Sequence, residues 1–116
     1  MVRVARSASL LLGADSLEFT WSEAKRREVI ASRRIDMLYA ALIFEGPVFI
    51  SRDVRKDYGE ERSIALGAVG LECFVVVFTI RDDTIRLITA WKGGRDDRKR
   101  YQEELARRPA GDAWAR

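Results

Sequence analysis

The sequence contains no histidine, which limits the proton-transfer and metal chemistry open to it. Histidine is the side chain most used for proton transfer near neutral pH and the commonest zinc ligand, so we exclude zinc, haem and Ser-His-Asp chemistry. Cations are abundant, with 21 Lys and Arg against 18 Asp and Glu and a formal net charge of +3. The composition therefore favours anionic ligands, with carboxylates, Lys, Arg, Tyr or hydroxyls as the available proton carriers.

Three arginines stand at the ends of expected strands: Arg62 begins one, Arg81 follows the next and Arg86 opens a third. In an antiparallel hairpin the end of one strand lies beside the start of the next, so Arg81 and Arg86 are expected to be neighbours. Whether Arg62 reaches the same face depends on a register that the sequence does not fix. Arginine suits phosphate because its planar fork donates two parallel hydrogen bonds. The alternative is that all three are solvated charges at strand ends.

Two nearby side chains could carry a proton, Glu60 and Lys25. Arginines around Glu60 would lower the pKa of its carboxyl and make it a weak base, so we expect it to orient Arg62 or Lys25 instead. A lysine on a solvated helix face is not desolvated enough to act as a base. We therefore expect cationic stabilisation and substrate orientation to contribute more than proton transfer.

The spacing of apolar residues predicts the elements that must position these residues. It has the period of a helix at first, then that of a strand, and then that of a helix again. Helices are expected at residues 20–34 and 37–45, with Thr20 and Asp36 as N-caps and Gly46-Pro47 ending the second. A third helix, with Asp96 or Asp97 as its N-cap, should run to about residue 107 and stop before Pro109. Four strands are expected between them, at residues 48–50, 62–68, 74–80 and 85–91.

Residues 74–80 are almost entirely β-branched or aromatic, which is typical of a strand covered on both faces. In the next strand, Ile85, Leu87 and Trp91 are expected to share one packed face. The order of elements predicts an α+β domain: two N-terminal helices, an antiparallel sheet of about four strands and a C-terminal helix.

A chain of 116 residues has room for one domain, which we place at residues 17–108. Residues 1–16 are expected to be a mobile N-terminal extension and residues 109–116 a frayed tail. The single cysteine, Cys73, lies in an apolar run and is expected to be a buried thiol, which fits a reducing cytoplasm. No stretch is apolar enough to cross a membrane.

Paired carboxylates at residues 82–83 and 96–97 could suggest a magnesium site, but they fit a turn and a helix start better. We therefore predict no metal and no other cofactor. The last helix carries Arg98 and Tyr101, which could track a nucleic-acid backbone and stack on a base. The alternative is that Tyr101 faces the sheet.

Several segments, in order, carry a resemblance to a known family. They are residues 19–26 (FTWSEAKR), 40–44 (AALIF), 57–62 (DYGEER), 64–67 (IALG), 75–79 (VVVFT) and 85–90 (IRLITA), followed by Arg98 and Tyr101. In this order the chain from Leu17 onward resembles the BrnT family, the toxin halves of bacterial toxin–antitoxin pairs, with a RelE-like ribonuclease fold.

The resemblance implies RNA cleavage without a metal, in which a ribose 2′-hydroxyl attacks the neighbouring phosphorus. It also implies a BrnA-like antitoxin, whose ribbon-helix-helix portion would bind operator DNA and so connect the toxin to DNA indirectly. The residues it implies for catalysis are Lys25, Glu60, Arg62, Arg81 and Arg86. Those it implies for RNA contact are Arg26, Lys92, Arg98 and Tyr101.

The chain departs from the family pattern at two places. Val29, Arg33 and Arg34 stand where the first helix usually has Asn and then His-Gly, and Trp91 stands where the last strand usually has a cation. An alternative interpretation is therefore a toxin relic that no longer cleaves RNA but still binds the antitoxin or RNA.

Overall fold

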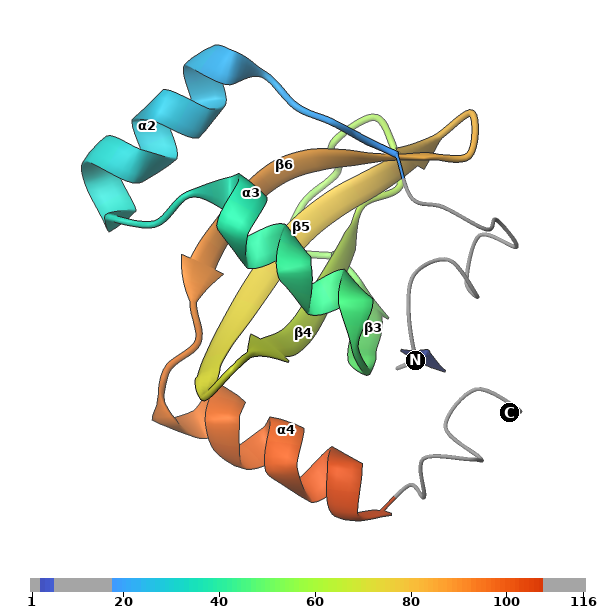
Figure 1. Ribbon diagram of the computed structural model, residues 1–116. Coiled ribbons are helices and arrows are strands. Elements are labelled where there is room, and N and C mark those ends of the chain that lie inside the picture. Colours follow the sequence, from blue (N-terminus) through green and yellow to red (C-terminus); the bar gives the residue numbers. More distant parts are fainter. Residues whose placement is uncertain (1–2, 6–17, 108–116) are drawn as a thin grey trace.

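The computed structural model describes residues 3–5 and 18–107, which form a twisted, mostly antiparallel sheet with helices on both faces (Figure 1). The elements in chain order are β1 (Arg3–Ala5), β2 (Phe19–Thr20), α2 (Glu23–Arg33), α3 (Met37–Ala40), the 3-10 helix η1 (Ala41–Glu45), β3 (Val48–Arg52), β4 (Ser63–Val69), β5 (Glu72–Arg81), β6 (Thr84–Lys92) and α4 (Arg95–Arg107). The strand order is β1-β3-β4-β5-β6-β2. The predicted α+β class is confirmed, with six strands in place of about four.

The two additional strands are short and lie at the two edges of the sheet. β1 pairs antiparallel with β3, and β2 pairs parallel with β6. Of the expected N-terminal extension, residues 1–16, only Arg3–Ala5 are described, and their backbone forms β1. The rest of that segment and the expected tail at residues 109–116 lie outside the described residues.

Side-chain caps begin the first two helices. The Ser22 side chain accepts a hydrogen bond from the Lys25 backbone N–H at 3.2 Å, so the N-cap of α2 lies two residues later than the expected Thr20. Thr20 is unavailable because it belongs to β2. The Asp36 carboxylate accepts from the Leu38 N–H at 2.9 Å, as predicted, although the helix tightens into a 3-10 turn after Ala40.

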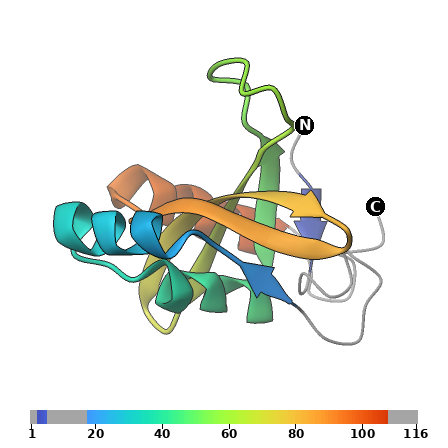
Figure 2. The same ribbon diagram turned by 90° about the horizontal axis from the view of Figure 1, so that it is seen from above.

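The sheet buries a separate hydrophobic cluster on each face. The α3 face, packed under α2, α3 and η1, contains Phe44 and Phe78, whose rings meet edge to face at 5.3 Å. The α4 face contains Phe49 and Tyr101, whose rings meet at 5.2 Å. β5 contributes buried residues to both clusters, as its sequence predicts, and Figure 2 shows α3 and α4 on opposite sides of the sheet.

A β-bulge changes which face the end of β6 presents. Val77 pairs with Thr89, whereas the next residue of β5, Phe78, pairs with Leu87, so β6 holds one extra residue at this point. The extra residue shifts the alternation of side chains by one position. The expectation that Trp91 shares a face with Leu87 is therefore wrong: Trp91 packs against the cluster on the α4 face.

Gly67 lets η1 pack closely on β4. A Cβ at this position would lie 2.7 Å from Ile43 Cβ and 3.1 Å from Val48 Cγ1. We expect Gly67→Ala to lower the free energy of unfolding by about 1–3 kcal/mol through overpacking, measured by urea denaturation. Gly46→Ala is the matched control, because a Cβ there meets no atom within 4 Å. Equal effects of the two substitutions would contradict the close contact.

Candidate functional site

One carboxylate links two arginines that come from different parts of the chain. Glu60 Oε2 accepts a hydrogen bond from Arg62 Nε at 3.2 Å, and its Oε1 accepts from Arg81 Nη2 at 2.6 Å. Glu60 lies in the loop before β4, Arg62 directly precedes β4 and Arg81 ends β5. The structure therefore brings Glu60, Arg62 and Arg81 together, 21 residues apart at the widest.

Arg86 joins them on the same face of the sheet. The β5–β6 register pairs Arg86 with Thr79, two residues before Arg81, so the two arginines are diagonal neighbours, with Cβ atoms typically about 7–8 Å apart. Continuing the β4–β5 register by one residue places Arg62 opposite Thr79 from the other side. We call Glu60, Arg62, Arg81 and Arg86 the arginine cluster. It occupies the part of the α4 face beyond α4.

Positive charge is in excess in the arginine cluster. Glu60 is shared by Arg62 and Arg81, and among the described residues no carboxylate forms an ion pair with Arg86. The hydrogen bonds from Arg81 and then from Arg62 hold the pKa of Glu60 below its ordinary value. Glu60 is therefore ionised at neutral pH, and its two oxygens already accept hydrogen bonds from guanidinium groups. The geometry suits anion binding better than proton abstraction by Glu60.

The loop that carries Glu60 begins with an ion pair between a buried carboxylate and an arginine whose side chain is 54% exposed. The Asp53 side chain has 0% exposure and accepts from Arg55 Nε and Nη2, both at 2.8 Å. The loop rises from the sheet on the side of α4 (Figure 2). Within it, the Tyr58 ring lies under the Arg62 guanidinium at 4.1 Å. The Tyr58 ring and the Glu60 carboxylate thus restrict Arg62 from two directions.

The other basic residues singled out in the sequence lie apart from the arginine cluster. Lys25 pairs with Glu28 at 3.3 Å, and Lys92 pairs with Glu72 at 3.1 Å. Arg98 Nη1 donates to the Gly93 carbonyl at 3.4 Å in the first turn of α4. None of these contacts joins a residue of the cluster.

Arg26 is engaged in ion pairs with two carboxylates of the helical region. Its guanidinium donates to both carboxylate oxygens of Asp36, at 2.9 and 2.7 Å, and to Glu23 at 3.0 Å. These bonds connect α2 to the first turn of α3 and balance the charge of Arg26. The pKa of Asp36 is lowered chiefly by the hydrogen bonds from Arg26.

Tyr101 lies in the core instead of at an open surface. Its side chain is buried, its ring packs on Phe49, and its hydroxyl donates to the Pro47 carbonyl at 3.0 Å. The ring therefore has no open face on which a base could stack, and the alternative that Tyr101 faces the sheet is the one observed. Cys73 is buried in the same cluster, as expected, and burial raises the pKa of its thiol.

A family model described as the ribonuclease toxin BrnT of type II toxin-antitoxin systems matches residues 21–97. The chain belongs to this family. The BrnT family consists of ribonuclease toxins whose type II systems pair each toxin with an antitoxin. No curated protein matches the chain. The BrnT match spans α2 to the start of α4 and so includes every residue of the arginine cluster.

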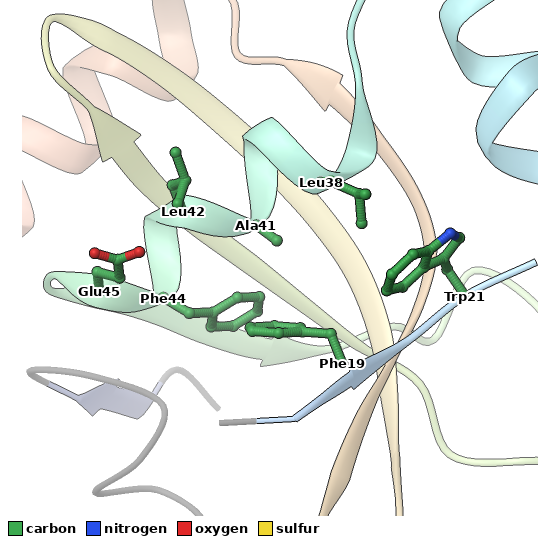
Figure 3. A pocket seen from close by; sticks show the side chains of 7 residues that line it. All are labelled: Phe19, Trp21, Leu38, Ala41, Leu42, Phe44 and Glu45. Atoms are coloured by element: carbon green, nitrogen blue, oxygen red, sulfur yellow. The ribbon is translucent and has the colours of Figure 1, made fainter. Parts of the chain in front are cut away.

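The BrnT chain also has an apolar pocket between β2 and the helices of the α3 face. It has a volume of about 450 Å³ and is lined by Phe19, Trp21, Leu38, Ala41, Leu42, Phe44 and Glu45 (Figure 3). The only charged side chain in this lining is the Glu45 carboxylate. An anionic substrate would find no cation there, so the arginine cluster is the better candidate site.

Among the described residues no helix has the length and apolar character needed to cross a membrane.

Two neighbours of the cluster, Tyr58 and Arg55, are not among the residues predicted from the sequence. Tyr58 stands in the segment DYGEER that carries the family resemblance, so an aromatic residue four positions before Arg62 was a usable signal. No sequence signal points to Arg55, because its pairing with Asp53 is important only when the Asp53 carboxylate is buried. Asp82 and Asp83 form the β5–β6 turn, as expected, with φ of 52° and 62°. The expected N-cap at Asp96 or Asp97 is wrong: α4 begins at Arg95, so both residues lie in its first turn, where Asp97 accepts from the Gly94 N–H at 3.1 Å.

The buried Asp53 should make the free energy of unfolding of this BrnT chain fall at low pH. Hydrogen bonds from Arg55 lower the pKa of Asp53 to about 2, so its contribution is present above the ordinary carboxyl pKa and is lost as the pH falls toward 2. We expect Asp53→Asn to lower the free energy of unfolding at pH 7 by about 1.5–3 kcal/mol. The difference between wild type and variant should shrink between pH 4 and pH 2.

Urea denaturation at several pH values measures this difference. Asp83→Asn, in the exposed β5–β6 turn, controls for the loss of one negative charge. A difference that stays constant from pH 7 to pH 2 would show that the Asp53 carboxylate is not held in its charged form.

Proposed function

We propose that this chain is an endoribonuclease that cleaves RNA at the arginine cluster without a metal ion. The observation that carries the proposal is the convergence of Arg62, Arg81 and Arg86 on one sheet face, with a single carboxylate among them. Membership of a family of ribonuclease toxins supports the choice of RNA as the anionic substrate.

In the proposed reaction the ribose 2′-oxygen bonds to the adjacent phosphorus as the bond from phosphorus to the 5′-oxygen breaks. Water accepts the 2′-hydroxyl proton and supplies one to the 5′-oxygen, so the products are a 2′,3′-cyclic phosphate and a 5′-hydroxyl. Negative charge on the phosphoryl oxygens grows toward the transition state, and fixed guanidinium groups stabilise it there more than in the ground state. Arg62 is suited to this role because Tyr58 and Glu60 hold it in place before RNA binds. Arg81 and Arg86 extend the contact to neighbouring oxygens.

Proton transfer is the weaker part of the proposed mechanism. Glu60 is ionised but engaged by two arginines, and Lys25 pairs with Glu28 on α2. We therefore assign Glu60 a positioning role for Arg62 and Arg81, and we retain Lys25 only as a residue that RNA binding could recruit. The RNA contacts assigned to Arg26, Lys92, Arg98 and Tyr101 are not favoured, because each already has a structural partner.

Metal independence is supported by how the chain uses its carboxylates. Asp82 and Asp83 form a tight turn, Asp97 closes the first turn of α4, and Glu60 is committed to two guanidinium groups. Within the described residues, no three histidine, cysteine or acidic side chains gather where they could hold an ion. Cations at the phosphate thus come from arginine.

The proposed partner is a BrnA-like antitoxin with a ribbon-helix-helix portion that binds operator DNA. The family implies an antitoxin, and the resemblance implies this type. DNA contact would then come through the antitoxin, and the toxin would act on RNA in the cytoplasm. The positive charge of the cluster favours an antitoxin segment with acidic side chains over the same surface.

Inducible expression in growing bacteria tests the function. Expression without an antitoxin should arrest growth, and Arg62→Ala or Arg86→Ala should abolish the arrest by removing cations at the phosphate. Arg27→Ala is the matched control: it removes the same charge from α2, where the Arg27 side chain is 78% exposed and pairs with no described carboxylate other than Glu23. Unaffected growth by the wild type, together with retained antitoxin binding, would favour the relic interpretation.

Purified RNA distinguishes the roles of Glu60. We expect Glu60→Gln to slow cleavage about tenfold, the effect of one charge-assisted hydrogen bond, because Arg62 and Arg81 lose their common partner. The pH dependence between 5 and 8 should keep its shape, since the pKa of Glu60 lies below its ordinary value. Glu61→Gln, at the neighbouring exposed position, is the control. A loss of about 100-fold or more with a changed pH profile would identify Glu60 as the base.

A further inference from the structure

Two arginines lie over the Trp91 ring, beyond the arginine cluster on the same face of the sheet. The Arg33 guanidinium carbon is 5.4 Å from the ring centroid and that of Arg55 is 5.6 Å from it. Arg33 ends α2 and Arg55 belongs to the loop after β3, so the three residues meet from three separate elements. The proposed cleavage reaction uses none of them.

The two cations over Trp91 differ in how their charge is balanced. Arg55 is neutralised by the buried Asp53 carboxylate through two hydrogen bonds. Arg33 is bound only by neutral acceptors, the Thr89 hydroxyl at 2.8 Å and the Ala90 carbonyl at 3.0 Å. Of the described carboxylates, none lies within ion-pair distance of Arg33. Its positive charge is therefore fixed in position but not compensated.

The geometry of Arg33 leaves one edge of its guanidinium open. Both hydrogen bonds leave from a single nitrogen, Nη1. The edge formed by Nε and Nη2 has no partner among residues 3–5 and 18–107, and the residue as a whole is exposed. Two parallel N–H groups on one edge are the arrangement that binds two oxygens of a phosphate.

We propose that Arg33, held by Thr89, Ala90 and the Trp91 ring, is a second phosphate-binding site for single-stranded RNA. The proposal rests on the proposed function and adds a contact away from the bond that is cut. Trp91 pairs with Val75 and Arg86 with Thr79, so the two sites are separated by four residues of β5, about 13 Å. An RNA strand lying along β5 and β6 reaches both.

The competing explanation is structural: Arg33 could simply fasten the end of α2 to β6. That role is satisfied by the two Nη1 hydrogen bonds and requires nothing of the open edge. The explanations therefore differ in RNA affinity, which a fastening residue would not change.

Binding of a fluorescently labelled 2′-O-methyl 12-mer, which cannot be cleaved through its 2′-oxygen, tests the site. We expect Arg33→Gln to weaken binding about tenfold, the effect of one charge-assisted contact. The slope of log affinity against log salt should fall by about 0.7, the value for one phosphate on a single strand. The matched control Arg27→Gln removes the same charge from the same helix and should change the affinity less than about twofold, since a surface charge contributes little.

Three comparisons make the test decisive. An unchanged affinity and slope in Arg33→Gln, or an equal loss in Arg27→Gln, would overturn the site. If Arg33→Gln does not fold, Arg33→Lys replaces it: lysine keeps the charge but not the two-pronged geometry, so affinity should fall while the salt slope stays the same. A wild-type affinity together with a wild-type salt slope in Arg33→Lys would also overturn the site.

Arg62→Ala separates this inference from the function on which it rests. If wild type binds the 12-mer and Arg62→Ala weakens binding while the Arg33 variants do not, only the second site fails. If wild type does not bind the 12-mer, the proposed function and the second site both fail.

Discussion

The contact of Tyr101 with the sheet determines how much of the α4 face is covered. Its ring packs on Phe49 and its hydroxyl reaches the Pro47 carbonyl, so α4 is fastened over one end of β3, β4 and β5. The other end of the same face has no helix above it in the described structure. Sheet positions there carry Arg62, Arg81 and Arg86, whose long side chains can reach solvent because no second apolar layer covers them. Thr79 between them is buried, and its hydroxyl donates to the Glu61 carbonyl at 2.7 Å. A helix anchored one turn further along would cover the positions that now present Arg62 and Arg86.

The uncovered part of the α4 face is positively charged because it holds more arginines than carboxylates. Arginines on adjacent strands repel one another, and Glu60 offsets that repulsion for Arg62 and Arg81 without neutralising both. A polyanion that lies across the strands can replace the missing negative charge. The loop that carries Glu60 must then be stiff, and the buried Asp53 carboxylate contributes to that stiffness because it cannot leave its exposed partner Arg55 without a large cost in free energy. A surface loop held by exposed pairs alone would let Glu60 move away and free the arginines.

Local signals in the sequence were sufficient to predict the helices, the Asp36 cap and the central strand. Asp36 and the run at residues 74–80 act through neighbours close in the chain, and both behave as predicted. Thr20 was assigned the wrong role because its pairing with Arg86 is a long-range contact that competes with capping. The bulge was equally hidden, since one extra residue in β6 leaves no mark on composition and yet moves Trp91 to the opposite face.

The arginine cluster was predictable in part, and the position of Arg33 was not. Arg81 and Arg86 follow from a hairpin, whose geometry is local, but Arg62 required the β4–β5 register. Arg33 bonds residues 56 and 57 positions away, and its side chain crosses the edge of β6 because β2 pairs only with the first half of that strand. A longer β2 would cover the Ala90 carbonyl and close this path. The shortness of one edge strand therefore lets Arg33, at the end of a helix on one face of the sheet, place its guanidinium over Trp91 on the other face.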